Sequence, residues 1–317
     1  MADAKVADVS SRTGSPSPRV GFVGLGRMGH HMGRHIAEAK LPLLVFDIRP
    51  DVVEEFCSAL EAKPARSMAD LGECDVVITM LPTSKEVRAV LVGESGEGGL
   101  AAALAPGSLV IDCSSSDPVE TRALGKLLAE RSIAMVDAPV AGGVVFAKDG
   151  TLDILLGGSD GARERARPVL KCFAGRFFEC GTLGAGHAMK VLNNFINAQA
   201  LITYAEALST GLKFGLDLDV MMNSMVGTTT GRNHPLEKKV AIQVLSREFA
   251  SGMALSLIAK DVGLARNLAT GMGMEAPILN SCLELWKRAA DEIGPLVDQT
   301  EVVRLWERDA GVELARS

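Results

Sequence analysis

The segment that decides the fold is Arg19-Val-Gly-Phe-Val-Gly-Leu-Gly-Arg-Met-Gly29. Its first five residues form a short apolar run that predicts a β-strand, and the glycines behind it have the spacing GxGxxG. A helical pattern follows to about Ala39, and a second apolar run, Leu43–Phe46, ends at Asp47. A strand, a glycine-rich turn, a helix, a strand and an acidic residue, in this order, predict a dinucleotide-binding βαβ unit.

Each glycine of this unit has a physical role. Gly24 permits a tight turn, Gly26 lets the backbone approach a pyrophosphate, and Gly29 lets the helix pack closely on the strand. Asp47 is expected to accept hydrogen bonds from the adenosine ribose and to repel a 2′-phosphate, which favours NAD over NADP. Arg49 complicates this preference, because a guanidinium there can pair with that phosphate. The alternative reading is a tight turn without a ligand.

The alternation of strands and helices continues to about residue 183 and predicts an α/β fold with a doubly wound parallel sheet. The carboxyl ends of strands line the ligand crevice in such sheets. Residues 79–82 and 114–116 are therefore candidates to line the cofactor, with simple strand-ending turns and caps as the alternative. Gly142 and Gly143 can turn two backbone N–H groups toward one anion, such as a carboxylate, or form a flexible hairpin connection.

A helical pattern fills the second part of the chain, with breaks at residues 215–217, 227–235, 271–277 and 294–295. It predicts an all-α domain over residues 184–317, behind a dinucleotide-binding domain over residues 19–183. Residues 1–18 are rich in Ser, Ala, Asp and Pro, and we expect them to form a disordered tail.

Lys190 stands out in the stretch Gly184-Ala-Gly-His-Ala-Met-Lys-Val-Leu-Asn-Asn194, which opens the second domain. It is the only charge between Met189 and Tyr204, in a helix so apolar that it is expected to be buried. Burying an ammonium group without a partner is energetically costly, so Lys190 is expected to have either an interaction partner or a function. His187 and Asn194 share its helical face. The alternative is that the lysine stem extends along the surface and its amine reaches solvent.

Composition excludes several classes of protein. The 317 residues suit two domains, and a net charge of -6 leaves no basic excess for a nucleic-acid partner. No apolar run is long enough for a membrane-spanning helix. Six cysteines lie scattered without a CxxC pair, which predicts reduced thiols and a cytoplasmic location. His30, His31 and His35 are expected on a helix surface without a metal.

Four motifs together resemble those of the β-hydroxyacid dehydrogenases, with the 3-hydroxyisobutyrate dehydrogenase type most similar. They are the segments 24–29, 137–143 and 184–194 and the pair Lys260-Asp261, and the resemblance extends from Arg19 to about Glu307. It implies a Rossmann-type domain followed by a helical domain for substrate binding and oligomerisation. The implied reaction transfers a hydride between NAD and a small 3-hydroxy acid, or its semialdehyde, in a homodimer or homotetramer.

The resemblance also implies roles for individual residues. Lys190 is the catalytic acid and base, Asn194 orients the substrate, and both contact it. The substrate carboxylate lies on Ala141, Gly142 and Gly143. No metal is needed if Lys190 moves the proton. The implied cofactor-binding residues are Gly24, Leu25, Gly26, Arg27, Met28, Gly29, Asp47, Met80, Leu81, Pro82, Ser115 and Lys260.

Some residues depart from the family pattern. Ala141 stands where a serine usually helps to hold the substrate, His187 replaces a common glutamine, and Ser115 replaces a threonine. These changes keep open a reductase of another semialdehyde, sugar acid or imine, or a cofactor-binding protein with weak turnover. Imine reductases of this fold generally lack the lysine, so Lys190 argues against that reading. Arg232 is a candidate for meeting a second anionic group, with a surface or capping role as the alternative.

Overall fold

The computed structural model describes residues 17–93, 98–228, 235–311 and 313–315. Contacts between Cα atoms divide the chain into two compact units, residues 1–195 and 196–317, and each unit is described by itself. The predicted tail lies outside the described residues except for Ser17 and Pro18, and Arg232 lies outside them as well.

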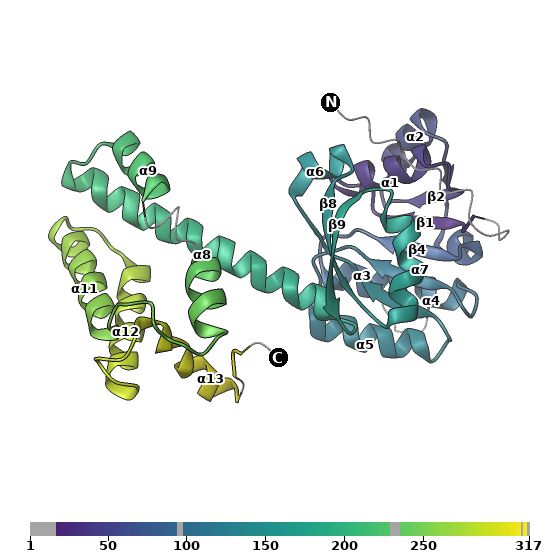
Figure 1. The fold of residues 1–317 in the computed structure, drawn as a ribbon. Helices are drawn as coiled ribbons and strands as arrows, with labels where there is room; N and C mark the ends of the chain where they lie inside the picture. Colours follow the sequence, from purple (N-terminus) through teal and green to yellow (C-terminus); the bar gives the residue numbers. More distant parts are fainter. Residues whose placement is uncertain (1–16, 94–97, 229–234, 312, 316–317) are drawn as a thin grey trace, which may run out of the picture. The chain divides into compact units, whose positions relative to one another are not determined.

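Unit 1 is an α/β unit built on one sheet (Figure 1). Its described strands run in the order β3-β2-β1-β4-β5-β6-β8-β7, and β9 pairs with β8. The six strands from β3 to β6 are parallel to one another, which confirms the Rossmann-type expectation. The strand bounds are β1 Val20–Val23, β2 Leu43–Phe46, β3 Lys63–Pro64, β4 Val76–Thr79, β5 Leu109–Asp112, β6 Ala134–Asp137, β7 Val140–Ala141, β8 Leu152–Gly157 and β9 Ala174–Gly181.

The central strands are short apolar runs because both faces of the sheet are covered. Successive side chains of a strand point to opposite faces, so Val76 and Ile78 enter one core and Val77 enters the other. The first core is completed by α1 Gly29–Glu38, α2 Pro50–Ala59, α6 Gly143–Asp149 and α7 Asp160–Leu170. The second is completed by the 3-10 helix η2 Met68–Glu73, α3 Ser84–Val92, α4 Gly99–Ala103 and α5 Pro118–Ala129.

The structure corrects several local expectations. The sheet is mixed, because β8 runs antiparallel to β6 and β7. Strand β9 was not predicted, since most of its side chains are exposed and it lacks a buried apolar stripe. Thr83 is the N-cap of α3, and its hydroxyl accepts a hydrogen bond from the Lys85 N–H at 3.1 Å.

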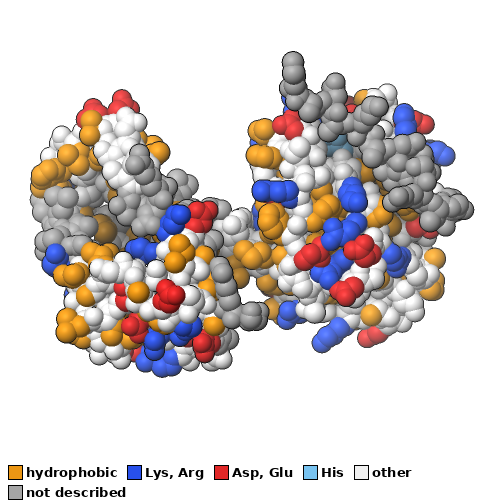
Figure 2. Space-filling view, viewed as in Figure 1, with side chains coloured by type: hydrophobic (Ala, Val, Ile, Leu, Met, Phe, Trp, Pro, Cys, Tyr) orange, Lys and Arg blue, Asp and Glu red, His pale blue; other side chains and the backbone are white. Residues whose placement is uncertain are grey.

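Charged side chains of both signs gather on the face of unit 1 seen in Figure 2. Arg163 on α7 donates to Glu179 on β9 at 2.5 Å, and Arg176 on β9 donates two hydrogen bonds to Asp153 on β8 at 2.8 and 2.7 Å. Because β9 is the outer strand beside β8, these charges discourage its open edge from pairing with another chain.

Helix α8, Ala185–Phe214, begins in unit 1 and continues into unit 2. The later described elements are α9 Leu218–Gly227, the π-helix η3 Leu236–Val244, α11 Leu255–Gly271, α12 Pro277–Glu292, the 3-10 helix η4 Gln299–Val303 and α13 Arg304–Ala310. Apart from one isolated bridge between Ala254 and Asp298, the described part of unit 2 is helical, as predicted. Its core contains Leu255, Ala289 and Leu305. Among the described residues, no helix is long and apolar enough to cross a membrane.

Candidate active site and cofactor pocket

The glycine-rich loop between β1 and α1 has the geometry that its spacing predicts. Gly24 has a φ of +100°, and a Cβ atom there would lie 2.3 Å from the Met80 carbonyl oxygen. A Cβ atom on Gly29 would lie 1.9 Å from the carbonyl oxygen of Gly24. A Cβ atom on Gly26 would meet nothing within 4 Å. The first and last glycines are therefore required by packing, whereas Gly26 leaves its backbone open to a ligand.

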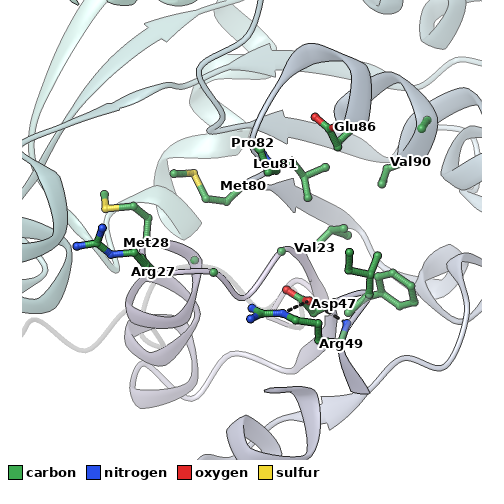
Figure 3. A pocket seen from close by; sticks show the side chains of 16 residues that line it. Val23, Arg27, Met28, Asp47, Arg49, Met80, Leu81, Pro82, Glu86 and Val90 are labelled. Carbon is green, nitrogen blue, oxygen red and sulfur yellow. Dashed lines mark hydrogen bonds and ion pairs between the residues drawn. The ribbon is translucent and has the colours of Figure 1, made fainter. Parts of the chain in front are cut away.

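A pocket of about 620 Å³ opens beside this loop (Figure 3). Its size suits a small-molecule ligand. Leu25, Ser115 and Lys260 are not among its lining residues. Leu25 is buried. Ser115 is exposed in the segment that follows β5, and Lys260 is an exposed residue of α11 in unit 2. From the predicted cofactor-binding set, the pocket brings together Gly24, Gly26, Arg27, Met28, Gly29, Asp47, Met80, Leu81 and Pro82.

Asp47 follows β2 and lies in the wall of this pocket. One carboxylate oxygen accepts a hydrogen bond from the Leu25 N–H at 2.8 Å, which ties the end of β2 to the glycine loop. The other oxygen accepts from the Arg49 N–H at 3.0 Å and lies 3.4 Å from Arg49 Nε (Figure 3). Each oxygen has two lone pairs, so the carboxylate keeps acceptor capacity for a ribose hydroxyl.

Some pocket residues were not in the predicted set. Ile48, which is 88% exposed, adds an apolar surface behind Asp47. Glu86, Ala89 and Val90 come from one face of α3, at the i, i+3, i+4 spacing. Helix α3 follows β4 directly in the sequence, and this position is the signal that could have indicated these three residues. A hydrogen bond from the Thr83 hydroxyl lowers the pKa of Glu86, so a second carboxylate in addition to Asp47 lines the pocket in its charged form.

The predicted carboxylate-binding residues lie between β7 and α6. Ala141 ends β7, and Gly142 and Gly143 have φ values of +120° and +75°. A Cβ atom on Gly142 would lie 2.8 Å from Phe146, whereas one on Gly143 would have no neighbour within 4 Å. The glycine pair therefore turns the chain from β7 into α6, which connects β7 to its antiparallel partner β8.

Helix α1 holds the far end of α6. Arg34 donates to the Lys148 carbonyl at 2.6 Å, and His35 Nε2 lies 3.1 Å from the Ala147 carbonyl oxygen. The expectation of surface histidines is wrong for His35, whose side chain is 14% exposed. The sequence gives no direct sign of this contact because α1 and α6 are about a hundred residues apart.

Lys190 lies near the start of α8 and is half-buried. Burial lowers the pKa of its ammonium group from the ordinary value of 10.5. Asn194, one turn later, is exposed. Part of this helix is exposed in the single chain, where Met189, Leu192 and Ile196 are 43%, 58% and 59% exposed.

His187 is fully buried one turn before Lys190. Its Nδ1 lies 2.8 Å from the Thr121 hydroxyl and its Nε2 3.1 Å from the Ser114 carbonyl oxygen. Its backbone N–H donates to Asp137 at 2.8 Å. These contacts all lie within unit 1, so the imidazole ring is enclosed by protein.

Two family models match the chain. The NAD-binding domain of 6-phosphogluconate dehydrogenase matches residues 19–182, and the NAD-binding domain of NADP-dependent 3-hydroxyisobutyrate dehydrogenase matches residues 184–306. A 2-(hydroxymethyl)glutarate dehydrogenase of Eubacterium barkeri is 31% identical over 94% of this chain and 98% of its own length. An NAD-dependent L-serine dehydrogenase of Pseudomonas aeruginosa is 35% identical over 85% of this chain and 91% of its own.

A solved structure extends this similarity to the fold. The 3-hydroxyisobutyrate dehydrogenase of Mycobacterium tuberculosis, solved with L-serine, superimposes with a TM-score of 0.63 at 30% identity, over 92% of this chain and 99% of its own. With both domains matched and the glycine loop open to a dinucleotide, the chain belongs to the β-hydroxyacid dehydrogenases of the 3-hydroxyisobutyrate dehydrogenase type and is an NAD-dependent oxidoreductase.

Proposed function

We propose that this enzyme interconverts a small 3-hydroxy acid and its semialdehyde, with Lys190 as the general acid and base. The observation that carries this proposal is the half-buried amine of Lys190, whose pKa burial lowers toward the working range. A general base works best when its pKa lies near the working pH. An ordinary surface lysine would stay almost fully protonated and could not accept a proton.

The chain supplies proton transfer and orientation. In the oxidative direction, the neutral Lys190 amine accepts the hydroxyl proton of the substrate as the C–H bond breaks, and a C=O bond forms. In the reductive direction, the Lys190 ammonium returns a proton to the new alkoxide. Bound NAD supplies the hydride acceptor for this chemistry. The lysine releases its proton to water between turnovers.

Substrate recognition is proposed at the glycine pair. The backbone N–H groups of residues 141–143 would hold the carboxylate, with both glycines free of the steric limits that a side chain imposes at positive φ. Asn194 would hold the substrate by its amide. Ala141 offers no hydroxyl here, so the carboxylate depends on backbone donors alone.

NAD, rather than NADP, is the proposed preferred cofactor. Asp47 and Glu86 place two carboxylates in the pocket wall, and both disfavour an additional phosphate. The glycine loop and Asp47 would hold NAD in the pocket, and we propose that Leu25, Ser115 and Lys260 contact it as well.

A substitution series with a substrate panel tests the proposed chemistry. Lys190→Ala should lower turnover by at least about 100-fold, the usual worth of acid–base catalysis, with little change in NADH affinity. Lys190→Arg is the matched control, because it keeps a cation that cannot accept a proton. Substrates should include short 3-hydroxy acids, hydroxy diacids, sugar acids, semialdehydes and cyclic imines with both cofactors. Near-normal turnover of Lys190→Ala, or turnover of imines alone, would contradict the proposal.

The finer organisation is also proposed. We assign residues 19–183 to cofactor binding and 184–317 to substrate binding and oligomerisation, which the limits of the two family models support. The exposed apolar side chains of α8 supply a surface for a homodimer or homotetramer. Light scattering of Leu192→Glu should show a smaller species than that of the wild type, whereas Leu296→Glu, which alters an exposed leucine between helices, should not. A wild-type monomer would contradict the assembly. A cytoplasmic location stays a prediction for cell fractionation to test.

A further inference from the structure

A row of buried polar residues crosses the carboxyl edge of the sheet. Thr79 ends β4, Asp112 ends β5 and Asp137 ends β6, and the strand register places them opposite one another. All three are fully buried. The Thr79 hydroxyl donates to Asp112 at 2.9 Å. Buried carboxylates require hydrogen-bond donors. The groups that donate to Asp112 and Asp137 are therefore held in place by these bonds.

Asp137 binds the start of α8. One of its oxygens accepts from the Gly184 N–H and the other from the His187 N–H, each at 2.8 Å. These N–H groups have no partners within the helix, because the first turn of any helix leaves them free. Gly186 has no room for a side chain, since a Cβ atom there would lie 2.2 Å from the Leu155 carbonyl oxygen.

The His187 ring joins α8 to two other elements. The Ser114 carbonyl can only accept, so Nε2 carries a hydrogen and donates to it at 3.1 Å. On the opposite side of the ring, Nδ1 pairs with the hydroxyl of Thr121 on α5 at 2.8 Å. The charged groups that face the ring are Asp112, 3.7 Å from Nε2, and Asp137, 3.9 Å from Nδ1.

Ser114 continues this network to the cofactor pocket. Its hydroxyl accepts from the Leu81 N–H at 2.9 Å, and Leu81 lines the pocket. Its own N–H donates to Asp112 at 3.0 Å. Ser114, the residue before the exposed Ser115, is therefore fixed by hydrogen bonds to both Leu81 and Asp112. A short series of hydrogen bonds thus runs from the pocket wall through Ser114 and His187 into the turn that precedes Lys190.

From these contacts we infer that His187 is a positioning residue, which fixes the Lys190 turn of α8 against the Ser114–Ser116 segment. The inference rests on the proposed function, because it gives His187 its effect through Lys190. Displacing a catalytic group by about 1 Å costs up to about 100-fold in rate. A ring with two hydrogen bonds in opposite directions restricts the turn more tightly than a side chain with one. A loosened turn would also let water reach Lys190, which moves its pKa back toward the ordinary value.

Substitutions at the two ends of the ring test this inference. His187→Leu removes both hydrogen bonds of the ring. Thr121→Val removes one of them with little change of shape, together with the hydrogen bond from the Thr121 hydroxyl to the Asp117 carbonyl at 2.9 Å. Thr121→Ser keeps the hydroxyl and serves as the rescue variant. Thr210→Val is the matched control, because Thr210 is also buried on α8 and its hydroxyl has no hydrogen-bond partner among the described residues. The readouts are kcat and KM in both directions, NADH affinity by fluorescence, Tm, and the pH profile of oxidation.

We expect Thr121→Val to lower kcat about 10-fold and His187→Leu about 100-fold, with NADH affinity changed less than about twofold. The rising limb of the oxidation profile should move to higher pH in both. Thr121→Ser and Thr210→Val should match the wild type. Should His187→Leu fail to fold, Thr121→Val and its serine rescue carry the test.

A fall in Tm alone, with kcat per folded enzyme and the pH limb unchanged, would show that His187 only stabilises the fold and would overturn the inference. Lys190→Ala in the same series separates the two proposals. If that variant keeps turnover, the proposed function is wrong. If it is inactive while Thr121→Val behaves like the wild type, only the positioning role is wrong.

Discussion

Arg49 Nε lies 3.4 Å from a carboxylate oxygen of Asp47, so the residue expected to repel a 2′-phosphate holds the residue able to bind one. Arg49 is 56% exposed, whereas the Asp47 side chain is 9% exposed. The exposed partner of such a pair contributes little stability and can move at small cost. We therefore propose that Asp47 decides the cofactor preference and that Arg49 supports any use of NADP.

Asp47→Asn removes the charge but keeps an oxygen that can accept from Leu25. We expect this substitution to raise the ratio of NADP to NAD efficiency at least about tenfold, which corresponds to about 1.4 kcal/mol. Arg49→Ala should lower the same ratio. The measurement is kcat/KM with both cofactors at one substrate concentration and one ionic strength. A wild-type preference for NADP, lost in Arg49→Ala, would show that Arg49 dominates.

The pH dependence of oxidation should report Lys190. Burial lowers its pKa, and the neutral amine is the form that accepts a proton, so kcat/KM for oxidation should rise with pH, and the midpoint of this rise should lie below pH 10.5. Reduction requires the ammonium and should fall over the same range. Both limbs should vanish in the residual activity of Lys190→Ala. A limb that persists in that variant belongs to another group.

Lys190→Met should give a stable but inactive protein. Replacing a half-buried ammonium by an apolar side chain of similar length removes its desolvation cost, so the free energy of unfolding should rise by about 1 kcal/mol at neutral pH. Because the folded protein disfavours the charged form, the gain should shrink as pH rises and the lysine loses its proton. Urea unfolding at two pH values measures both effects. A loss of stability would mean that the ammonium has a favourable partner.

Ala141→Ser should strengthen binding of a small carboxylate substrate. A hydroxyl beside the glycine pair adds a hydrogen bond to a charged group, which is worth about 1.5–3 kcal/mol, so KM should fall about tenfold or more. A diol of the same size, which lacks the carboxylate, is the control substrate and its KM should not change. An equal change for both substrates would place the carboxylate elsewhere.

The two glycines at this turn should differ in their tolerance of a side chain. Gly142→Ala meets Phe146 at 2.8 Å in addition to its positive φ, whereas Gly143→Ala meets only the backbone penalty of about 1–2 kcal/mol. Thermal unfolding should therefore show the larger loss for Gly142→Ala. Equal losses would show that Phe146 moves aside freely.

Features of this structure that depend on residues close together in the sequence can be predicted from it, and features that depend on distant residues cannot. The β1–α1–β2 unit is predictable because the spacing of Gly24 and Gly29 and the position of Asp47 reflect contacts within a short stretch. Strand β9 is not predictable, because its exposed side chains form no apolar pattern. The antiparallel direction of β8 is not predictable either, because the apolar pattern of a strand does not show its direction. The His187 contacts join residues 66 and 73 positions apart, to Thr121 and Ser114, so spacing alone cannot show them.

The three glycines of the first loop differ in what can compensate for their loss. The obstacles to a side chain at Gly24 and Gly29 are backbone oxygens, of Met80 and of Gly24 itself, and no second-site substitution removes a backbone oxygen. Suppressor mutations should therefore be hard to find for either position. No described atom lies within 4 Å of a Cβ atom at Gly26, so we expect that only cofactor binding requires a glycine there. In a descendant that lost its cofactor but kept its fold, Gly26 would be free to drift while Gly24 and Gly29 stayed fixed.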